Sequence, residues 1–168
     1  MSEKQWLESN RYYPTIEEEK LKSIFYFLFV WNIFEKECCH KNASIGNHPK
    51  NLADNLSNNI DSNLLNEIFQ YFQNRYIENG DVNDIFNSFD FGREPASTTY
   101  KNFVKDRLLK EETTNQEKLQ ALLYIAFRLR NNLFHGIKDV EKLYEQNENF
   151  KQINSLLMVI IEQKSYCR

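Results

Sequence analysis

Glycine and proline are scarce in this chain of 168 residues, which holds four glycines and three prolines. Proteins made of many short strands need these residues at their turns, so the scarcity argues against an all-β fold. Long segments instead repeat apolar residues at helical spacing. One such series is Leu64, Leu65, Ile68, Phe69 and Phe72. The sequence therefore predicts an all-α protein, an up-and-down helical bundle with long core helices and short additional helices.

Cysteine is also rare, and the three cysteines include the adjacent pair Cys38 and Cys39. An odd number of cysteines with two neighbours does not fit a disulfide framework, which favours a reducing compartment. The first residues, MSEKQWLES, are polar and acidic, whereas a secretory signal starts basic and then becomes apolar. We therefore expect a cytoplasmic protein.

Apolar runs long enough to span a bilayer are missing as well. The most apolar run, IFYFLFVWNIF from Ile24 to Phe34, has eleven residues and includes Asn32. A membrane span needs about 20 such residues, so this run predicts a helix buried on most sides and no membrane partner. The aromatic content of 14% and the length favour one domain over residues 1–168 with a core rich in rings.

A large excess of basic residues is absent too, since the formal net charge is -3. This balance is a weak argument against a general nucleic-acid binder, although it leaves room for a small basic patch. The most basic surface predicted is the segment that carries Lys101, Lys105, Arg107 and Lys110.

Several helix ends have clear signals. Thr15 with Glu18 and Thr114 with Glu117 form two capping boxes, in which a hydroxyl and a carboxylate bind free backbone amides. Asp61 is a suitable N-cap. We predict long helices over 15–40, 62–77, 97–109, 114–136 and 139–163, a short helix within 51–60, and a packed loop with one helical turn over 81–95.

The most informative stretch is RLRNNLFHGIK, from Arg128 to Lys138, at the end of the helix that begins near Thr114. Arg130 carries a planar charged fork suited to a phosphate, and His135 can exchange a proton near neutral pH. Asn131 lies four residues before His135 and so on the same helix face.

The plain interpretation of this cluster is an ordinary helix end, since basic residues near the C-terminus interact favourably with the helix dipole. On charge alone that interpretation is preferred. Asn131 and Asn132, however, are poor mid-helix residues that cost roughly 0.5 kcal/mol each relative to alanine. Their presence in an apolar helix indicates a local role for their amides.

The motif RNNLFHG resembles the signature of HEPN domains, a superfamily of all-α domains that includes nucleases. Arg130 matches the arginine of that signature, Asn131 its polar position and His135 its histidine, with four residues between arginine and histidine. Gly136 and Lys138 extend a form common in bacterial members. The place of the motif, on the penultimate long helix after an aromatic first helix, also resembles the HEPN bundle.

The resemblance implies a metal-independent endoribonuclease without a cofactor, whose active site forms across a homodimer. His135 would act as general acid or base, Arg130 would hold the scissile phosphate, and Asn131 would orient the histidine or bind the phosphate. The products would be a 2′,3′-cyclic phosphate and a 5′-hydroxyl, made from single-stranded or loop RNA. Arg128, Asn132 and Lys138 are the candidate substrate-binding residues.

The same resemblance suggests a toxin or phage-defence effector, with an antitoxin or another regulatory protein as a further partner. The alternative is a non-catalytic HEPN-like helical module that binds a partner or a nucleotide. A weaker third hypothesis makes tyrosines near the motif the substrates of a nucleotide-modifying partner. Glu35 is a minor candidate for reaching the cluster from the first long helix.

A metal site is the least favoured hypothesis. Cys38, Cys39, His40 and His48 are ligand types, but consecutive helical residues point in different directions. No second pair of ligands follows at a spacing typical of zinc sites. We therefore predict no metal.

Overall fold

The computed structural model describes residues 1–9, 17–92, 95–134 and 140–166, and the statements below concern these residues. The helices are α1 (Glu3–Ser9), the 3-10 helix η1 (Glu18–Leu21), α2 (Lys22–Cys38), α3 (His48–Leu56), α4 (Ser62–Tyr76), α5 (Asp84–Ser88), α6 (Pro95–Leu109), α7 (Asn115–Phe134) and α8 (Val140–Tyr166). Two short strands, β1 (Ile77–Glu78) and β2 (Asp81–Val82), form a hairpin. The predicted all-α helical bundle is confirmed.

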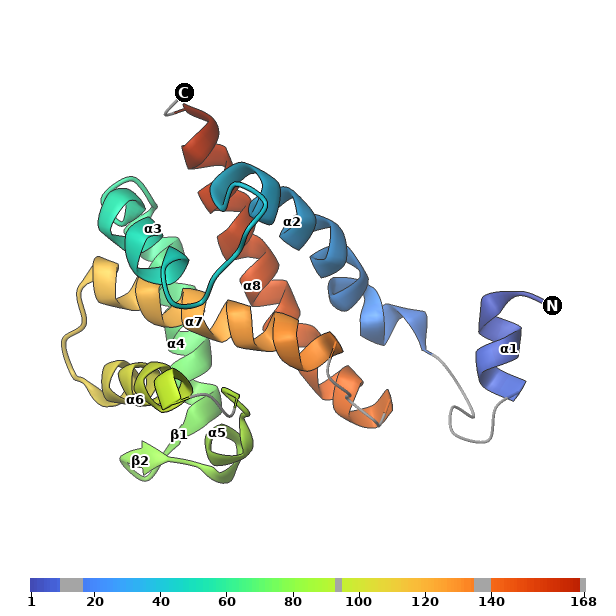
Figure 1. Cartoon of the computed structure of the whole chain (residues 1–168). Coiled ribbons are helices and arrows are strands. Elements are labelled where there is room, and N and C mark those ends of the chain that lie inside the picture. Colours follow the sequence, from blue (N-terminus) through green and yellow to red (C-terminus); the bar gives the residue numbers. More distant parts are fainter. Residues whose placement is uncertain (10–16, 93–94, 135–139, 167–168) are drawn as a thin grey trace.

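Helix α7 is the centre of the bundle. All nine residues from Ala121 to Leu129 are buried, so this stretch of the helix has no solvent-exposed side. Figure 1 shows α7 running between the pair α2 and α8 on one side and the group α3, α4 and α6 on the other. An all-round apolar helix is stable only when it is enclosed in this way.

The pair α2 and α8 joins the early and late parts of the chain. The two helices lie side by side and run in the same direction (Figure 1). Ser23 donates its backbone amide to Asn147 Oδ1 at 2.9 Å, and its carbonyl accepts from Asn154 Nδ2 at 2.8 Å. The rings of Phe27 and Phe150 pack edge to face with centroids 4.7 Å apart. The core between these helices is therefore aromatic, as expected.

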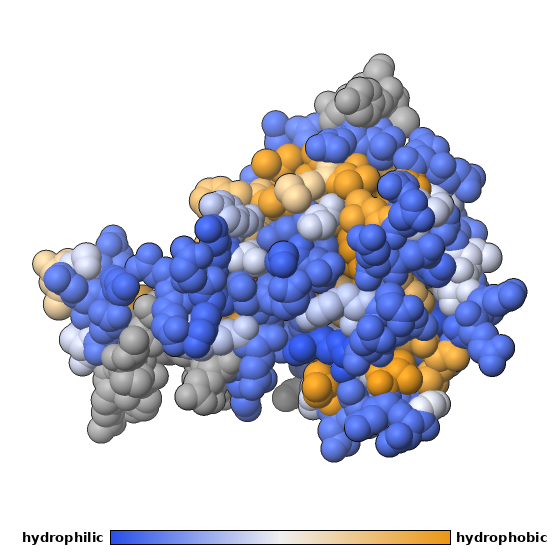
Figure 2. Space-filling view, turned by 180° about the vertical axis from the view of Figure 1, so that it is seen from behind, coloured by the Kyte–Doolittle hydropathy of each residue, from blue (hydrophilic) through white to orange (hydrophobic). Residues whose placement is uncertain are grey.

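One side of α2 is exposed, which corrects the expectation that its apolar run would be buried on most sides. Trp31 and Phe34 are buried and pack against Phe127 of α7, but Phe29 is 70% exposed and Ile33 48% exposed. The reason is that α7 and α8 both approach α2 from the same side. On the face seen in Figure 2, hydrophobic side chains gather in the upper part of the view.

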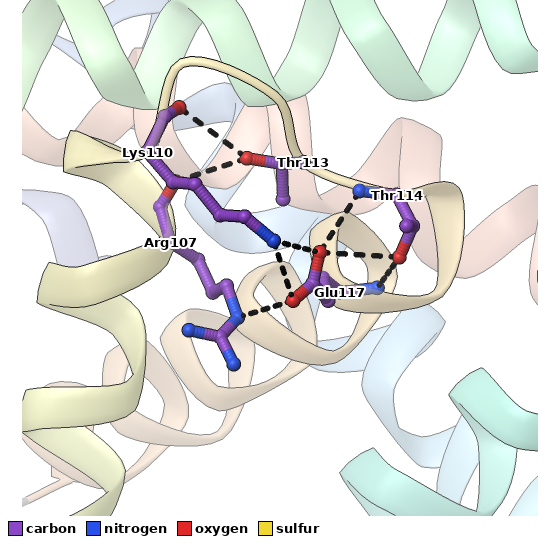
Figure 3. A network of polar contacts seen from close by, with 5 residues as sticks. All are labelled: Arg107, Lys110, Thr113, Thr114 and Glu117. Carbon is purple, nitrogen blue, oxygen red and sulfur yellow. Dashed lines mark hydrogen bonds and ion pairs between the residues drawn. The ribbon is translucent and has the colours of Figure 1, made fainter.

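The predicted capping box at Thr114 and Glu117 is confirmed (Figure 3). The Thr114 amide donates to Glu117 Oε2 at 3.0 Å, and the Glu117 amide donates to Thr114 Oγ1 at 3.2 Å. The same carboxylate forms an ion pair with Arg107 Nε at 2.9 Å and accepts from Lys110 Nζ at 3.1 Å. The start of α7 is thereby tied to the end of α6.

The segment that carries Lys101, Lys105, Arg107 and Lys110 was predicted to be the most basic surface, but its cations are engaged in contacts within the chain. Arg107 and Lys110 share Glu117, while Lys105 lies 3.1 Å from Asp81 Oδ1. Lys101 donates to the carbonyl of Asn87 at 2.7 Å. All four cations bind partners within the chain, so this surface offers less free positive charge than the sequence suggests.

The hairpin is the element that the sequence analysis missed. Helix α4 starts at the predicted cap, where Asp61 Oδ1 accepts from the Asn63 amide at 2.8 Å, but it ends at Tyr76. Asn79 and Gly80 then take positive φ values of 52° and 82°. Two such residues make a two-residue turn of the type that joins tight hairpins. The Asn-Gly signal was present, but the flanking strands are too short to show alternation.

The other helix boundaries lie close to the predicted ones. The short helix α3 and the single turn α5 lie near their predicted places. The capping residue Thr15 lies outside the described residues, and the first long helix begins as η1 at Glu18. It ends at Cys38, just before His40 and Lys41, which have positive φ values of 49° and 64°.

The capping network gives the first testable prediction. The pKa of Glu117 is lowered, chiefly because its carboxylate accepts from the Thr114 amide. A lowered pKa stabilises the fold above the ordinary glutamate pKa, and this stability is lost as pH falls through the folded pKa. We expect Glu117→Gln to reduce the free energy of unfolding by about 1 kcal/mol at about pH 7, and the difference to be smaller at about pH 3, below the ordinary glutamate pKa.

Urea denaturation at the two pH values measures this difference. The control is Glu112→Gln, which changes an exposed glutamate close to the same helix start. An equal loss of stability in both variants would show that the network has no special role.

Candidate active site

The polar end of α7 begins where its buried stretch stops. Arg130, Asn131 and Asn132 follow Leu129 directly and are partly exposed. The helix ends at Phe134. His135 and Lys138, which complete the predicted site, lie outside the described residues, so the structure does not place them.

Arg130 is oriented by an aromatic ring of α2. Its guanidinium carbon lies 5.9 Å from the ring centroid of Trp31, within the range of a cation–π contact. Its Nη1 donates to Asn131 Oδ1 at 3.2 Å. A ring and a neighbouring amide thus restrict the guanidinium at a partly exposed helix end. Such restriction lowers the entropy lost when an arginine binds an anion.

Trp31 is a residue that the sequence analysis missed as part of this site. It is buried, and its ring packs edge to face on Phe127 with centroids 5.0 Å apart. The ring is therefore fixed by the core, and it carries Arg130 on its face. The sequence had no signal for this contact, because it depends on how α2 and α7 cross.

Arg128 has a different role from Arg130. It is buried, with 9% exposure, and its Nε donates to the carbonyl of Asp90 at 3.0 Å. Asn132 Nδ2 donates to the same carbonyl at 3.2 Å, and Arg128 Nη2 donates to Asn132 Oδ1 at 3.5 Å. Arg128 and Asn132 were predicted to bind substrate. That role stays a prediction, and their contacts show a structural role, in which they clamp the loop after α5 onto α7.

The clamped loop is shaped to fit the Arg128 side chain. Gly92 has a φ of 99°, and a Cβ atom there would lie 3.4 Å from Arg128 Nη1. The Asp90 carboxylate accepts from the Gly92 amide at 2.6 Å, which fixes the turn. Phe89 stacks on Tyr76 with centroids 5.8 Å apart. The clamped loop thus also packs an aromatic side chain against the C-terminal end of α4.

Glu35, the minor candidate from the first long helix, makes its hydrogen bonds within the turn after α2. Its carboxylate accepts from the Ala43 amide at 3.4 Å, and its carbonyl accepts from the Lys41 amide at 2.9 Å. These bonds shape the turn that follows α2.

Cys39 is unsuited to nucleophilic chemistry. Cys38 and Cys39 are buried, and burial raises the pKa of Cys39 to about 12. A thiol with so high a pKa is not ionised near neutral pH, and the thiolate is the reactive form. Within the described ranges, no group of three or more histidine, cysteine or acidic residues could hold a metal ion. None of the helices described there is long and apolar enough to cross a membrane.

Comparisons with models of known protein families, with curated proteins and with solved structures found no match to this chain. The resemblance to HEPN domains therefore rests on the residues of the motif, and membership of that superfamily stays a prediction. The residues at the C-terminal end of α7 are therefore the basis for a proposed function.

The two arginines can be separated by measuring stability. Arg128→Met keeps an unbranched side chain in the clamp but removes its charged hydrogen bonds, so we expect the free energy of unfolding to fall by about 2 kcal/mol. Arg130→Met, at the partly exposed position, should cost less than half as much. Urea denaturation of both variants measures the difference. Equal losses would contradict the division into a buried structural arginine and a partly exposed one.

Proposed function

We propose that this protein is a metal-independent endoribonuclease that cleaves single-stranded or loop RNA. The observation that carries the proposal is the restrained guanidinium of Arg130, which lies on Trp31 at the partly exposed end of α7. His135 is five positions further along the chain. An arginine fork and a histidine are the two groups that phosphodiester transfer needs.

In the proposed reaction, the ribose 2′-oxygen attacks the adjacent phosphorus atom. The bond from phosphorus to the 5′-oxygen breaks, which leaves a 2′,3′-cyclic phosphate and a 5′-hydroxyl. His135 removes the proton of the 2′-hydroxyl or supplies one to the leaving 5′-oxygen. Arg130 stabilises the negative charge that grows on the phosphoryl oxygens. Asn131 orients the guanidinium through the bond that it already accepts from Arg130.

Proton removal and proton supply need two groups, and the motif has one histidine per chain. A symmetric homodimer provides the second histidine, so the base and the acid come from different chains. No metal or cofactor is needed, since the nucleophile belongs to the substrate. We further propose that the enzyme acts in the cytoplasm as a toxin or phage-defence effector. An antitoxin or another regulatory protein would hold it in check.

The second candidate is a non-catalytic helical module that binds a protein partner or a nucleotide. Two observations favour it. Arg128 and Asn132 are engaged with the Asp90 carbonyl, and the cations of α6 are engaged with partners of their own. Among the described residues, these contacts reduce the number of cationic side chains near α7 that a nuclease could use to hold its substrate.

RNA cleavage in EDTA distinguishes the two candidates. We expect the purified protein to cut transfer RNA or an unstructured RNA in EDTA, and His135→Asn or Arg130→Ala to slow cleavage by at least roughly 100-fold. An RNA with one 2′-deoxyribose at the cut site should resist cleavage there, because the nucleophile is missing.

The matched control is His40→Asn, which makes the same substitution at an exposed histidine after α2. This variant should cleave like the unaltered protein. Absence of cleavage with every RNA tested would contradict the proposed nuclease and favour the binding module. Cleavage that survives His135→Asn would contradict the proposed role of His135.

A further inference from the structure

The outer face of α2 is the most apolar surface that the structure exposes. We define this face by five side chains that together point away from the core: Phe25, Tyr26, Leu28, Phe29 and Ile33. They are 46%, 57%, 41%, 70% and 48% exposed. In the part of the chain that the structure describes, no helix lies over this side of α2 (Figure 1). Met158 of α8 adds a sixth apolar group, 47% exposed.

The size of this surface is that of an interaction site. A large side chain has a surface of about 200 Å². Multiplying this area by the exposed fraction of each of the six side chains gives a total exposed apolar area on the order of 600 Å². The largest apolar patch of a typical monomer reaches about 300–600 Å², and a stable interface covers about 800 Å² per partner. The outer face of α2 with its polar rim is therefore large enough for the core of a dimer interface.

The face is also complementary to itself. Positions 23 to 34 carry no charged residue, and Phe29 is the most exposed of the five apolar side chains of the face. Phe25 and Ile33 lie about one helical turn before and after it. A two-fold axis at Phe29 would place Phe25 of one copy over Ile33 of the other, apolar on apolar. An interface between identical copies requires this kind of symmetry.

The charges at the rim do not oppose such pairing. Lys22 and Lys36 lie at opposite ends of the face, and antiparallel pairing brings the one near the other. Each lysine already has an acidic neighbour, since Lys22 lies 3.5 Å from Glu19 and Lys36 lies 3.1 Å from Glu37. The paired charges also make the face unsuitable for the RNA backbone or an anionic membrane, which need free cations.

We infer that a second copy of this chain covers the outer face of α2. Trp31, which carries Arg130, lies on the same helix three residues after Leu28, but it points into the core rather than to the outer face. The inference deepens the proposed function, and rests on it only for the claim that the second copy completes the active site. The case for association rests on the surface itself.

Sedimentation velocity over a range of protein concentrations tests the inference. Phe29→Glu and Ile33→Glu place a charge in the proposed interface, and we expect each to weaken dimerisation at least 100-fold. The matched control is Ile85→Glu on α5, because Ile85 is 47% exposed and Ile33 is 48% exposed. Thermal unfolding of all variants checks that the exposed substitutions leave the fold intact.

A dimer that Ile33→Glu and Phe29→Glu dissociate and Ile85→Glu does not would support the inference. A monomer at all concentrations, or a dimer insensitive to both substitutions, would overturn it. Cleavage of RNA by the same samples separates this claim from the proposed function. A dimer that never cleaves RNA overturns the nuclease alone, whereas a monomer that cleaves RNA overturns the interface and the two-chain active site but not the nuclease.

Discussion

Everything in this structure depends on the enclosure of α7. Nine consecutive residues, from Ala121 to Leu129, have no exposed side, so the other helices must surround them. Because the middle of α7 is buried, its polar side chains can reach solvent or a ligand only at the two ends of the helix. At the N-terminal end, Thr114 and Glu117 bind each other, and Glu117 also binds Arg107 of α6 and Lys110 just after it, which leaves little for an external ligand. At the C-terminal end, Arg130 and the asparagines reach the surface, and the candidate site lies there.

The end of α7 holds two arginines with opposite roles. Positions two apart on a helix differ by about 200°, so Arg128 and Arg130 point to opposite sides. Arg128 points to the loop after α5 and holds the Asp90 carbonyl, while Arg130 points to Trp31 of α2. The first contact fixes the helix end in place, and the second restrains a guanidinium near solvent. A catalytic arginine needs both a rigid support and an open side, and the neighbouring clamp supplies the support.

The sequence predicted correctly the helix caps that depend only on residues close together in the chain. The capping box at Thr114 and the cap at Asp61 depend on neighbouring residues alone, and both are confirmed. Contacts between distant segments were not predictable. The aromatic run of α2 has apolar residues on all sides, so only its packing on α7 and α8 shows that the Phe29 side is exposed. In the same way, the motif residues were read from the sequence, but the clamp role of Arg128 appears only once the loop at Asp90 is in contact with it.

The central claim is that one active site needs the histidines of two chains. Mixing the unaltered protein with His135→Asn at a 1:1 ratio, after subunit exchange and at constant total concentration, tests this claim most directly. If only dimers with two intact histidines cleave RNA, about one quarter of the full activity remains, since random pairing gives that share of unaltered dimers. If each chain cleaves RNA on its own, about one half remains. An activity near one quarter is the result that we predict, and an activity near one half would contradict the two-chain site.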